Sequence, residues 1–209
     1  GDHSCAIGTW KGIAQAMPGP LGLIWIDAHM DAHTPQTTES GRLHGMPLAA
    51  LLGHGDETLT GIARGARLDP RHVCLIGVRS FEAGEAALLR RLGVRIFPMR
   101  EVRQRGFDAA LREARKIACA GTAGYGISVD LDAIDPVEAP GVGSPVRGGL
   151  SGKDVVNALA NHAGDAELRG LEIVEYNPHL DCDAQTIALV PAIAESLLAP
   201  QRAFEFARP

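Results

Sequence analysis

Apolar runs of strand length alternate with helix-like stretches along this chain. Runs rich in Val, Ile and Leu without polar interruption are typical of strands in a sheet that is covered on both faces. We predict strands at residues 22–26, 73–78, 94–97, 126–129 and 170–174. Helices are predicted in the intervals, at residues 5–17, 47–52, 83–92, 107–118, 152–163 and 184–198.

This alternation predicts an α/β fold, a three-layer α/β/α arrangement around a mostly parallel central sheet with right-handed crossovers. Ser151 stands where it can cap the helix at 152–163, and Gly93 stands where a glycine commonly ends a helix. No internal repeat, linker or low-complexity stretch interrupts the pattern. We therefore expect residues 1–209 to form a single domain.

The overall composition fits a globular protein. Of 209 residues, 45% are hydrophobic and 22% are charged, which is enough apolar material for one buried core. The net charge of -5 and the absence of a Lys/Arg-rich run argue against a nucleic-acid or membrane-surface partner. A small cationic substrate is compatible with this charge.

The cysteines and the apolar runs restrict the setting. Cys5, Cys74, Cys119 and Cys182 form no CxxC pair, so neither a zinc knuckle nor a dense disulfide framework is indicated. Reduced thiols and a cytoplasmic location fit best. The longest apolar runs, such as residues 21–26, are far shorter than the roughly 20 residues of a membrane span.

Acidic residues directly follow three of the predicted strands. Asp27, Asp130 and Glu175 each come at the end of an apolar run. In a parallel α/β sheet, ligands bind where the loops at the carboxyl ends of the strands converge. We therefore expect these three acids to lie on one rim of the sheet.

Two of these positions open motifs with an i, i+2 spacing, which in extended backbone places side chains on one side. Together with a histidine near the start of the chain, they give six candidate metal ligands: His3, Asp27, His29, Asp31, Asp130 and Asp132. Four carboxylates this close would raise each other's pKa values unless two divalent cations neutralised them. Oxygen and imidazole donors without thiolate favour two Mn²⁺ ions, with iron, cobalt and nickel as alternatives. A water bridging two such ions loses a proton near neutral pH and becomes a nucleophile.

Over nearly its whole length the chain resembles the arginase/agmatinase (ureohydrolase) family, and among its members most resembles bacterial-type arginases. The motifs are GDHS at residues 1–4, DAHMD at 27–31, HGMP at 44–47, SVDLDAIDP at 128–136, GSP at 143–145 and EYNP at 175–178. The resemblance implies a hydrolase that uses two manganese ions to cleave the guanidinium group of L-arginine to ornithine and urea.

The resemblance also implies roles for the metal ligands. One ion would be held by His3, Asp27, Asp31 and Asp130, and the other by Asp27, His29, Asp130 and Asp132, so Asp27 and Asp130 would be shared. Asp31 would accept a hydrogen bond from the bridging hydroxide and pass its proton to the departing amine.

Further roles fall on residues outside the ligand set. His44 would shuttle protons, which suits the near-neutral pKa of imidazole. Glu175 would hold the substrate guanidinium, and Ser144 would lie near it. By the same resemblance Ser40 would receive the α-carboxylate, and Glu82, supported by Glu85, the α-ammonium.

Two substrate-site positions differ from the usual arginase pattern. His33 and Arg42 stand where arginases commonly carry asparagines. Arg42 would pair with an α-carboxylate more strongly than an amide does, or would favour a guanidino acid without an α-amine. L-arginine is therefore the first expected substrate, and agmatine and guanidinobutyrate are the alternatives.

Two alternative hypotheses belong to other functional classes. One is a deacetylase-like hydrolase with a single zinc ion, and the other is a catalytically silent metal-binding member of the family. The complete set of ligands disfavours both. The resemblance implies a homo-oligomer, a trimer or hexamer. It also implies that N-terminal strands are missing from the chain, which would leave an apolar edge of the sheet uncovered.

Overall fold

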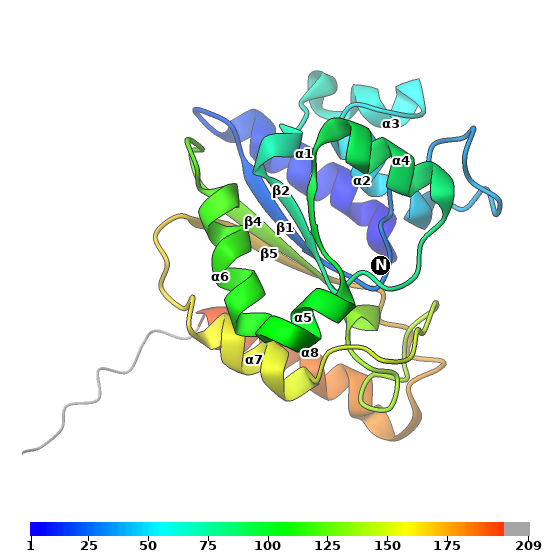
Figure 1. Cartoon of the computed structure of the whole chain (residues 1–209), viewed down its shortest axis with the longest axis vertical. Coiled ribbons are helices and arrows are strands. Elements are labelled where there is room, and N and C mark those ends of the chain that lie inside the picture. The colour runs from blue at the N-terminus through cyan, green and yellow to red at the C-terminus, as the bar shows by residue number, and fades with distance from the viewer. Residues whose placement is uncertain (199–209) are drawn as a thin grey trace, which may run out of the picture.

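Five parallel strands form one sheet in the computed structural model, which describes residues 1–198 (Figure 1). The strands are β1 (Gly22–Ile26), β2 (Val73–Ile76), β3 (Arg95–Phe97), β4 (Tyr125–Asp130) and β5 (Leu168–Val174). Their order is β3-β2-β1-β4-β5, and all neighbours are parallel. Because the chain builds outward from β1 on one side and then returns to β4 on the other, the switch point lies between β1 and β4. Ligand sites of α/β sheets open at the carboxyl ends of such a pair.

Helices cover both faces of the sheet (Figure 1). One face packs against α1 (Ala6–Ala16), α2 (Pro47–Leu51) and α4 (Ala83–Leu92). The other packs against α5 (Met99–Arg105), α6 (Phe107–Ala118), α7 (Gly152–Ala160) and α8 (Gln185–Leu198). Alternate residues of β1 enter these two cores, Leu23 and Trp25 on the first face and Ile24 and Ile26 on the second. The expected three-layer α/β/α fold is confirmed.

The element boundaries differ from the predicted ones by a few residues. The first strand has the predicted bounds, whereas β2 stops at Ile76, where Gly77 turns the chain with a φ of 101°. The helix expected at 152–163 ends at Ala160. Gly93 closes α4 in the left-handed conformation, as predicted. Ser151 precedes α7 but makes no capping bond, and the Gly152 N–H at the start of this helix donates to the Glu138 carboxylate at 2.9 Å.

Two short α-helices within residues 1–198 were not predicted. The first, α3 (Glu57–Gly61), has only five residues and begins where Asp56 accepts hydrogen bonds from Thr58 and Leu59. The second, α5, follows Pro98 directly after β3. Its sequence MREVRQR is mostly charged, so only Met99 and Val102 turn inward and no helical period stands out.

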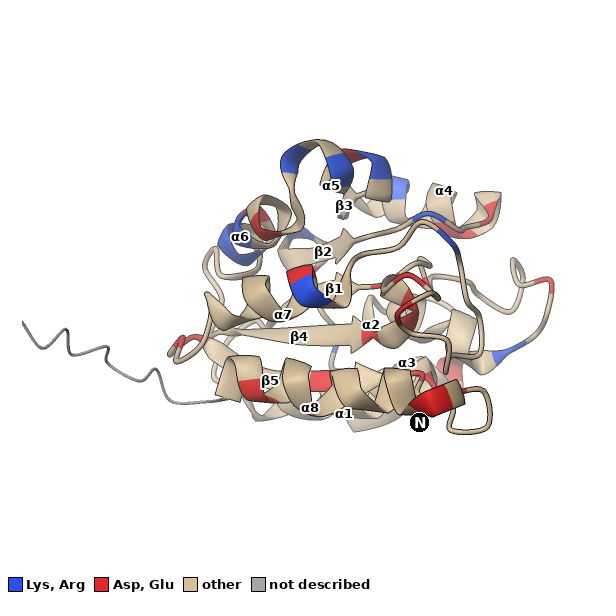
Figure 2. Cartoon of the chain, turned by 90° about the horizontal axis from the view of Figure 1, so that it is seen from below, with Lys and Arg blue, Asp and Glu red and all other residues tan. Residues whose placement is uncertain are grey.

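The carboxyl ends of β1, β4 and β5 meet at one rim, as the sequence predicts. Ile26 pairs with Val129, and Asp130 pairs with Val174, so Asp27, Asp130 and Glu175 end neighbouring strands almost in register. Figure 2 shows acidic residues beyond the arrowhead of β4. The candidate ligands therefore share the mouth of the switch point.

The outer strand β5 differs from the central strands in burial. Every residue of β4 is buried, whereas most residues of β5 are partly exposed, and within residues 1–198 β5 pairs with β4 alone. The four cysteines are all free thiols. No helix within the described residues combines the length and the apolar character that a bilayer crossing requires.

Candidate metal centre and substrate cavity

The two Asp motifs leave their strands through the same local turn. Asp27 Oδ1 accepts from the His29 N–H at 2.7 Å, and Asp130 Oδ1 accepts from the Asp132 N–H at 2.7 Å. Each carboxylate thus bends the chain two residues after its strand, as Asp side chains do in turns. The i, i+2 spacing therefore brings the side chains together through a turn, and not through the extended backbone that the sequence predicts.

His3 lies at the centre of the first ligand group. It begins a 3-10 turn (His3–Cys5) that Asp2 caps, and its ring stacks on Trp25 with centroids 3.9 Å apart. Its Nδ1 is 3.0 Å from Asp130 Oδ2, 3.1 Å from Asp31 Oδ2 and 3.2 Å from Asp27 Oδ2. These four side chains are buried, and one ligand atom from each lies within 4.8 Å of the others.

The second ligand group shares Asp27 with the first. His29 Nδ1 lies 3.1 Å from Asp132 Oδ2 and 3.5 Å from Asp27 Oδ1. The three atoms meet the same 4.8 Å limit. Asp130, which we expected in both groups, meets the 4.8 Å limit in the first, and its Oδ1 accepts from the Asp132 N–H.

A buried network behind His3 fixes the direction of its ring. The Ser128 hydroxyl donates to Glu172 Oε2 at 2.8 Å, and Trp10 Nε1 donates to the same oxygen at 3.0 Å. Ser128 Oγ therefore accepts from His3 Nε2–H at 2.9 Å. With the Nε2 proton directed at Ser128, Nδ1 is the ring nitrogen that faces the three carboxylates, an arrangement that suits a cation among them. This observation fits the residues to a bound metal.

Neither Ser128 nor Glu172 was predicted from the sequence. Ser128 precedes Asp130 by two residues on β4, and Glu172 is its partner on β5. Trp10 reaches Glu172 because β4 carries a glycine at Gly126, where a Cβ would lie 2.0 Å from the indole. The only available signal was the period of two along β4, which places Ser128 on the same side as Asp130.

Arg79, beyond the end of β2, holds the backbone of Asp132 in place. Its guanidinium donates to the carbonyls of Asp132 and Val146 at 2.7 Å and to that of Ala133 at 3.2 Å. It thereby ties the turn after β4 to the loop that carries Ser144. This role of Arg79 was not predicted from the sequence.

Without bound metal the cluster holds protons. Burial and the neighbouring Asp27 charge raise the pKa of Asp31 to about 8, although His3 and His29 oppose this shift. Burial and the charges of Asp132 and Asp27 raise the pKa of Asp130 well above its usual value. For His29, burial lowers the pKa, but hydrogen bonds to Asp132 and Asp27 outweigh it and raise the pKa to about 11.

These shifts predict that manganese stabilises the protein more at higher pH. A raised folded-state pKa contributes stability that disappears as pH rises, from 3.8 to about 8 for Asp31 and from 6.5 to about 11 for His29. Bound metal must displace these protons, so its apparent affinity increases roughly tenfold per pH unit for each proton released. We expect the gain in melting temperature with Mn²⁺, measured against EDTA-treated protein, to grow from about pH 6 to about pH 8. A gain that is constant or falls over this interval would contradict the assignment.

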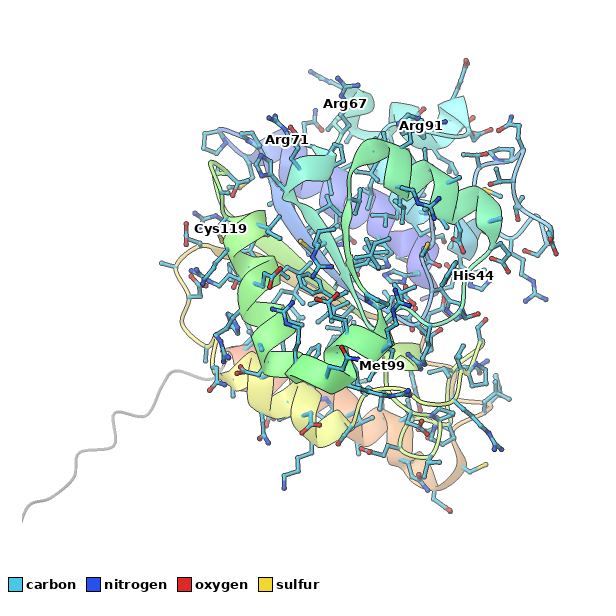
Figure 3. The ribbon with its side chains drawn as sticks, in the orientation of Figure 1. His44, Arg67, Arg71, Arg91, Met99 and Cys119 are labelled. Atoms are coloured by element: carbon cyan, nitrogen blue, oxygen red, sulfur yellow. The ribbon has the colours of Figure 1, made fainter. Side chains whose placement is uncertain are left out.

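Glu175 and His44 face the cluster from the other side. Glu175 follows β5 with a φ of 66°, and its Oε1 accepts from the His3 N–H at 2.8 Å. His44 Nδ1 lies 3.4 Å from the same oxygen. Figure 3 shows His44 at the end of the molecule toward which the strands run, with Arg71 at the opposite end. Asp31 also has a positive φ, 50°, and such backbone strain in non-glycine residues is common at functional sites.

A cavity of about 210 Å³ opens over the cluster. The predicted ligands on its wall are His29, Asp31, Asp130 and Asp132, whereas His3 and Asp27 lie buried beneath it. The other predicted residues on the wall are His33, Ser40, Arg42, His44, Glu82, Ser144 and Glu175. Ser80 also lines the cavity and was not predicted.

A third group of possible ligand atoms lies at the outer end of the cavity: His33, Glu82 and Glu85. Glu85 Oε1 accepts from the Glu82 N–H at 3.0 Å, and its Oε2 accepts from the Ala32 N–H at 3.2 Å. Both oxygens of Glu85 therefore support the backbone of the cavity wall.

Comparison with known proteins gives one consistent family. A model of the arginase family matches residues 1–199. The arginase of Bacillus caldovelox is 43% identical over 198 residues, 94% of this chain and 66% of that protein. The arginase of Brevibacillus brevis is 40% identical over 198 residues, again 94% of this chain and 66% of that protein. The chain thus spans about two thirds of the length of these relatives.

The fold agrees with solved structures of similar proteins. The native structure of Bacillus caldovelox arginase superposes with a TM-score of 0.91 at 42% identity, covering 97% of this chain and 68% of that one. A proclavaminate amidino hydrolase from Streptomyces clavuligerus superposes with a TM-score of 0.76 at 29% identity, covering 94% of this chain and 60% of that one.

Proposed function

This chain belongs to the arginase family, and we propose that it is a hydrolase that uses two Mn²⁺ ions to release urea from a guanidino compound. L-arginine is the first proposed substrate. The observation that carries the proposal is the position of the buried ligand cluster directly beneath the cavity that Glu175 lines. The ions would be held by His3, Asp27, Asp31 and Asp130 and by Asp27, His29 and Asp132. When bound, they would supply hydroxide from water near neutral pH.

Glu175 would hold the guanidinium of the substrate. Within residues 1–198 its Oε2 accepts no hydrogen bond, while Oε1 is fixed by the His3 N–H. A carboxylate paired with a planar cation of several N–H donors fixes both the distance and the plane of that cation. Glu175 would thereby direct the central guanidinium carbon toward the ligand cluster.

Asp31 and His44 would move protons. Asp31 belongs to the first ligand group and also lines the cavity, so its carboxylate can both receive a proton and pass it to the departing amine. His44 lies on the cavity wall beside Glu175 and is partly exposed, which suits an imidazole that exchanges protons with solvent. Ser144, on the same wall, would contact the guanidinium end.

The outer part of the cavity would receive the tail of the substrate. Ser40 and Arg42 lie there and would bind a carboxylate, while Glu82 is the acid available to an ammonium. A guanidino acid without an α-amine, such as guanidinobutyrate, is a second candidate, because His33 already donates to Glu82 at 2.9 Å. Agmatine, which has no carboxylate, would make no use of Arg42.

Urea release by the manganese-loaded, full-length protein tests the proposal. We expect hydrolysis of L-arginine, slower hydrolysis of agmatine, and detectable hydrolysis of guanidinobutyrate. Absence of urea with all three compounds would contradict the proposed activity. A single tightly held metal ion per chain would favour the deacetylase-like alternative, and two ions without turnover would favour a catalytically silent member. A cytoplasmic location and a trimeric or hexameric assembly stay predictions.

A further inference from the structure

His33 is paired with Glu82, the carboxylate that an α-ammonium would need. Its Nε2 lies 2.9 Å from Glu82 Oε2 and 3.8 Å from Glu85 Oε1. Because an ionised carboxylate only accepts hydrogen bonds, the proton between His33 and Glu82 belongs to Nε2. One of the two Glu82 oxygens is therefore already paired within the protein.

A second contact holds the His33 ring in its orientation. The Nδ1 of His33 lies 3.1 Å from Thr37 Oγ1, and the Thr34 N–H donates to the same oxygen at 2.9 Å. Thr37 packs on the first turn of α4, where a Cβ at Gly84 would come within 2.7 Å of Thr37 Cβ. His33 is buried, so the imidazole stays in place between the loop and Glu82.

The cavity wall also carries a cation that has no charged partner among residues 1–198. Arg42 lines the same outer end, beside Ser40, whose hydroxyl accepts from the Arg42 N–H at 3.3 Å. Among the described residues, the Arg42 guanidinium makes no ion pair or side-chain hydrogen bond. The free charge offered to a substrate tail is thus positive, while the negative charge of Glu82 is shared with His33.

We propose that His33 is a specificity-determining residue that closes Glu82 to an α-ammonium, so that a terminal carboxylate carries most of the tail recognition. This inference rests on the proposed function, since it concerns the tail of the same guanidino substrate. It makes 5-guanidinopentanoate, which is L-arginine without the α-amine, a substrate comparable with L-arginine. Both compounds keep the carboxylate that Arg42 and Ser40 would bind.

Replacing His33 with Asn tests the proposal in the manganese-loaded, full-length protein. The shorter, neutral amide frees Glu82, so the ratio of kcat/KM for L-arginine to that for 5-guanidinopentanoate should increase about tenfold, which is the lower end of the couplings found for close charge pairs. Adding Glu82→Gln to His33→Asn should return the ratio to its starting value. His72→Asn, the same change at the amino end of β2, is the matched control and should leave the ratio unchanged.

The outcomes separate this inference from the proposed function. An unchanged ratio in His33→Asn, or an equal loss for both compounds, would overturn the role of His33 while urea release still supports the activity. If wild-type protein releases no urea, the proposed function is wrong. In that case calorimetry gives the dissociation constants of the two compounds for wild type and His33→Asn. A preference for L-arginine that rises in His33→Asn supports the role of His33, and an unchanged preference overturns it.

Discussion

Replacing Asp130 with Asn is expected to remove most of the bound manganese. Asp130 is buried, its Oδ2 lies 3.0 Å from His3 Nδ1, and its Oδ1 already accepts from the Asp132 N–H. The amide keeps the size of the side chain but removes the negative charge that faces the ion. Loss of a direct ligand should weaken binding by at least about a hundredfold, since even outer partners of a ligand are worth 10- to 100-fold.

Metal content after dialysis, measured by inductively coupled plasma mass spectrometry, checks this expectation. The matched control is Asp154→Asn on the exposed side of α7, which should keep the wild-type manganese content. Circular dichroism of both variants establishes that the fold persists. Wild-type manganese content in Asp130→Asn would remove Asp130 from the ligand set.

Replacing Glu175 with Gln is expected to lower kcat/KM for urea release about a hundredfold while the metal content stays unchanged. The glutamine oxygen can still accept from the His3 N–H, which Glu175 Oε1 does at 2.8 Å, so the local backbone should hold. What is lost is the charge that pairs with the guanidinium, and a charge-assisted hydrogen bond is worth roughly twice a neutral one. The loss should appear in kcat/KM, because orientation of the guanidinium is needed in the transition state.

The control for this variant is Glu195→Gln, an exposed position on α8. It should change neither metal content nor turnover. Undiminished urea release by Glu175→Gln would exclude the proposed contact with the guanidinium. Loss of metal in the same variant would instead indicate that Glu175 supports the cluster through His3.

The fold and the grouping of the candidate ligands at one rim could be predicted because both leave strong local signals. Uninterrupted apolar runs predict buried parallel strands, and an acid directly after such a run lies at the carboxyl end of its strand, where the ligand sites of these sheets open. Asp27 and Asp130 satisfy this rule, and their neighbours two residues on are carried into the site by the turn that each carboxylate makes.

The supporting residues could not be predicted because their contacts depend on register and packing. Ser128 and Glu172 meet only once β4 and β5 are aligned, and Trp10 joins them from α1 across the glycine of β4. The left-handed backbone at Asp31 and Glu175 is likewise imposed by the surrounding structure, since neither residue favours it alone. The bond between His33 and Glu82 joins positions 49 residues apart and has no local signature.

Manganese-edge anomalous diffraction from crystals of the metal-loaded, full-length protein would locate the bound ions themselves. We expect two peaks in each chain, one among His3, Asp27, Asp31 and Asp130 and one among Asp27, His29 and Asp132. A single peak, or manganese bound anywhere other than beneath the cavity, would contradict this expectation.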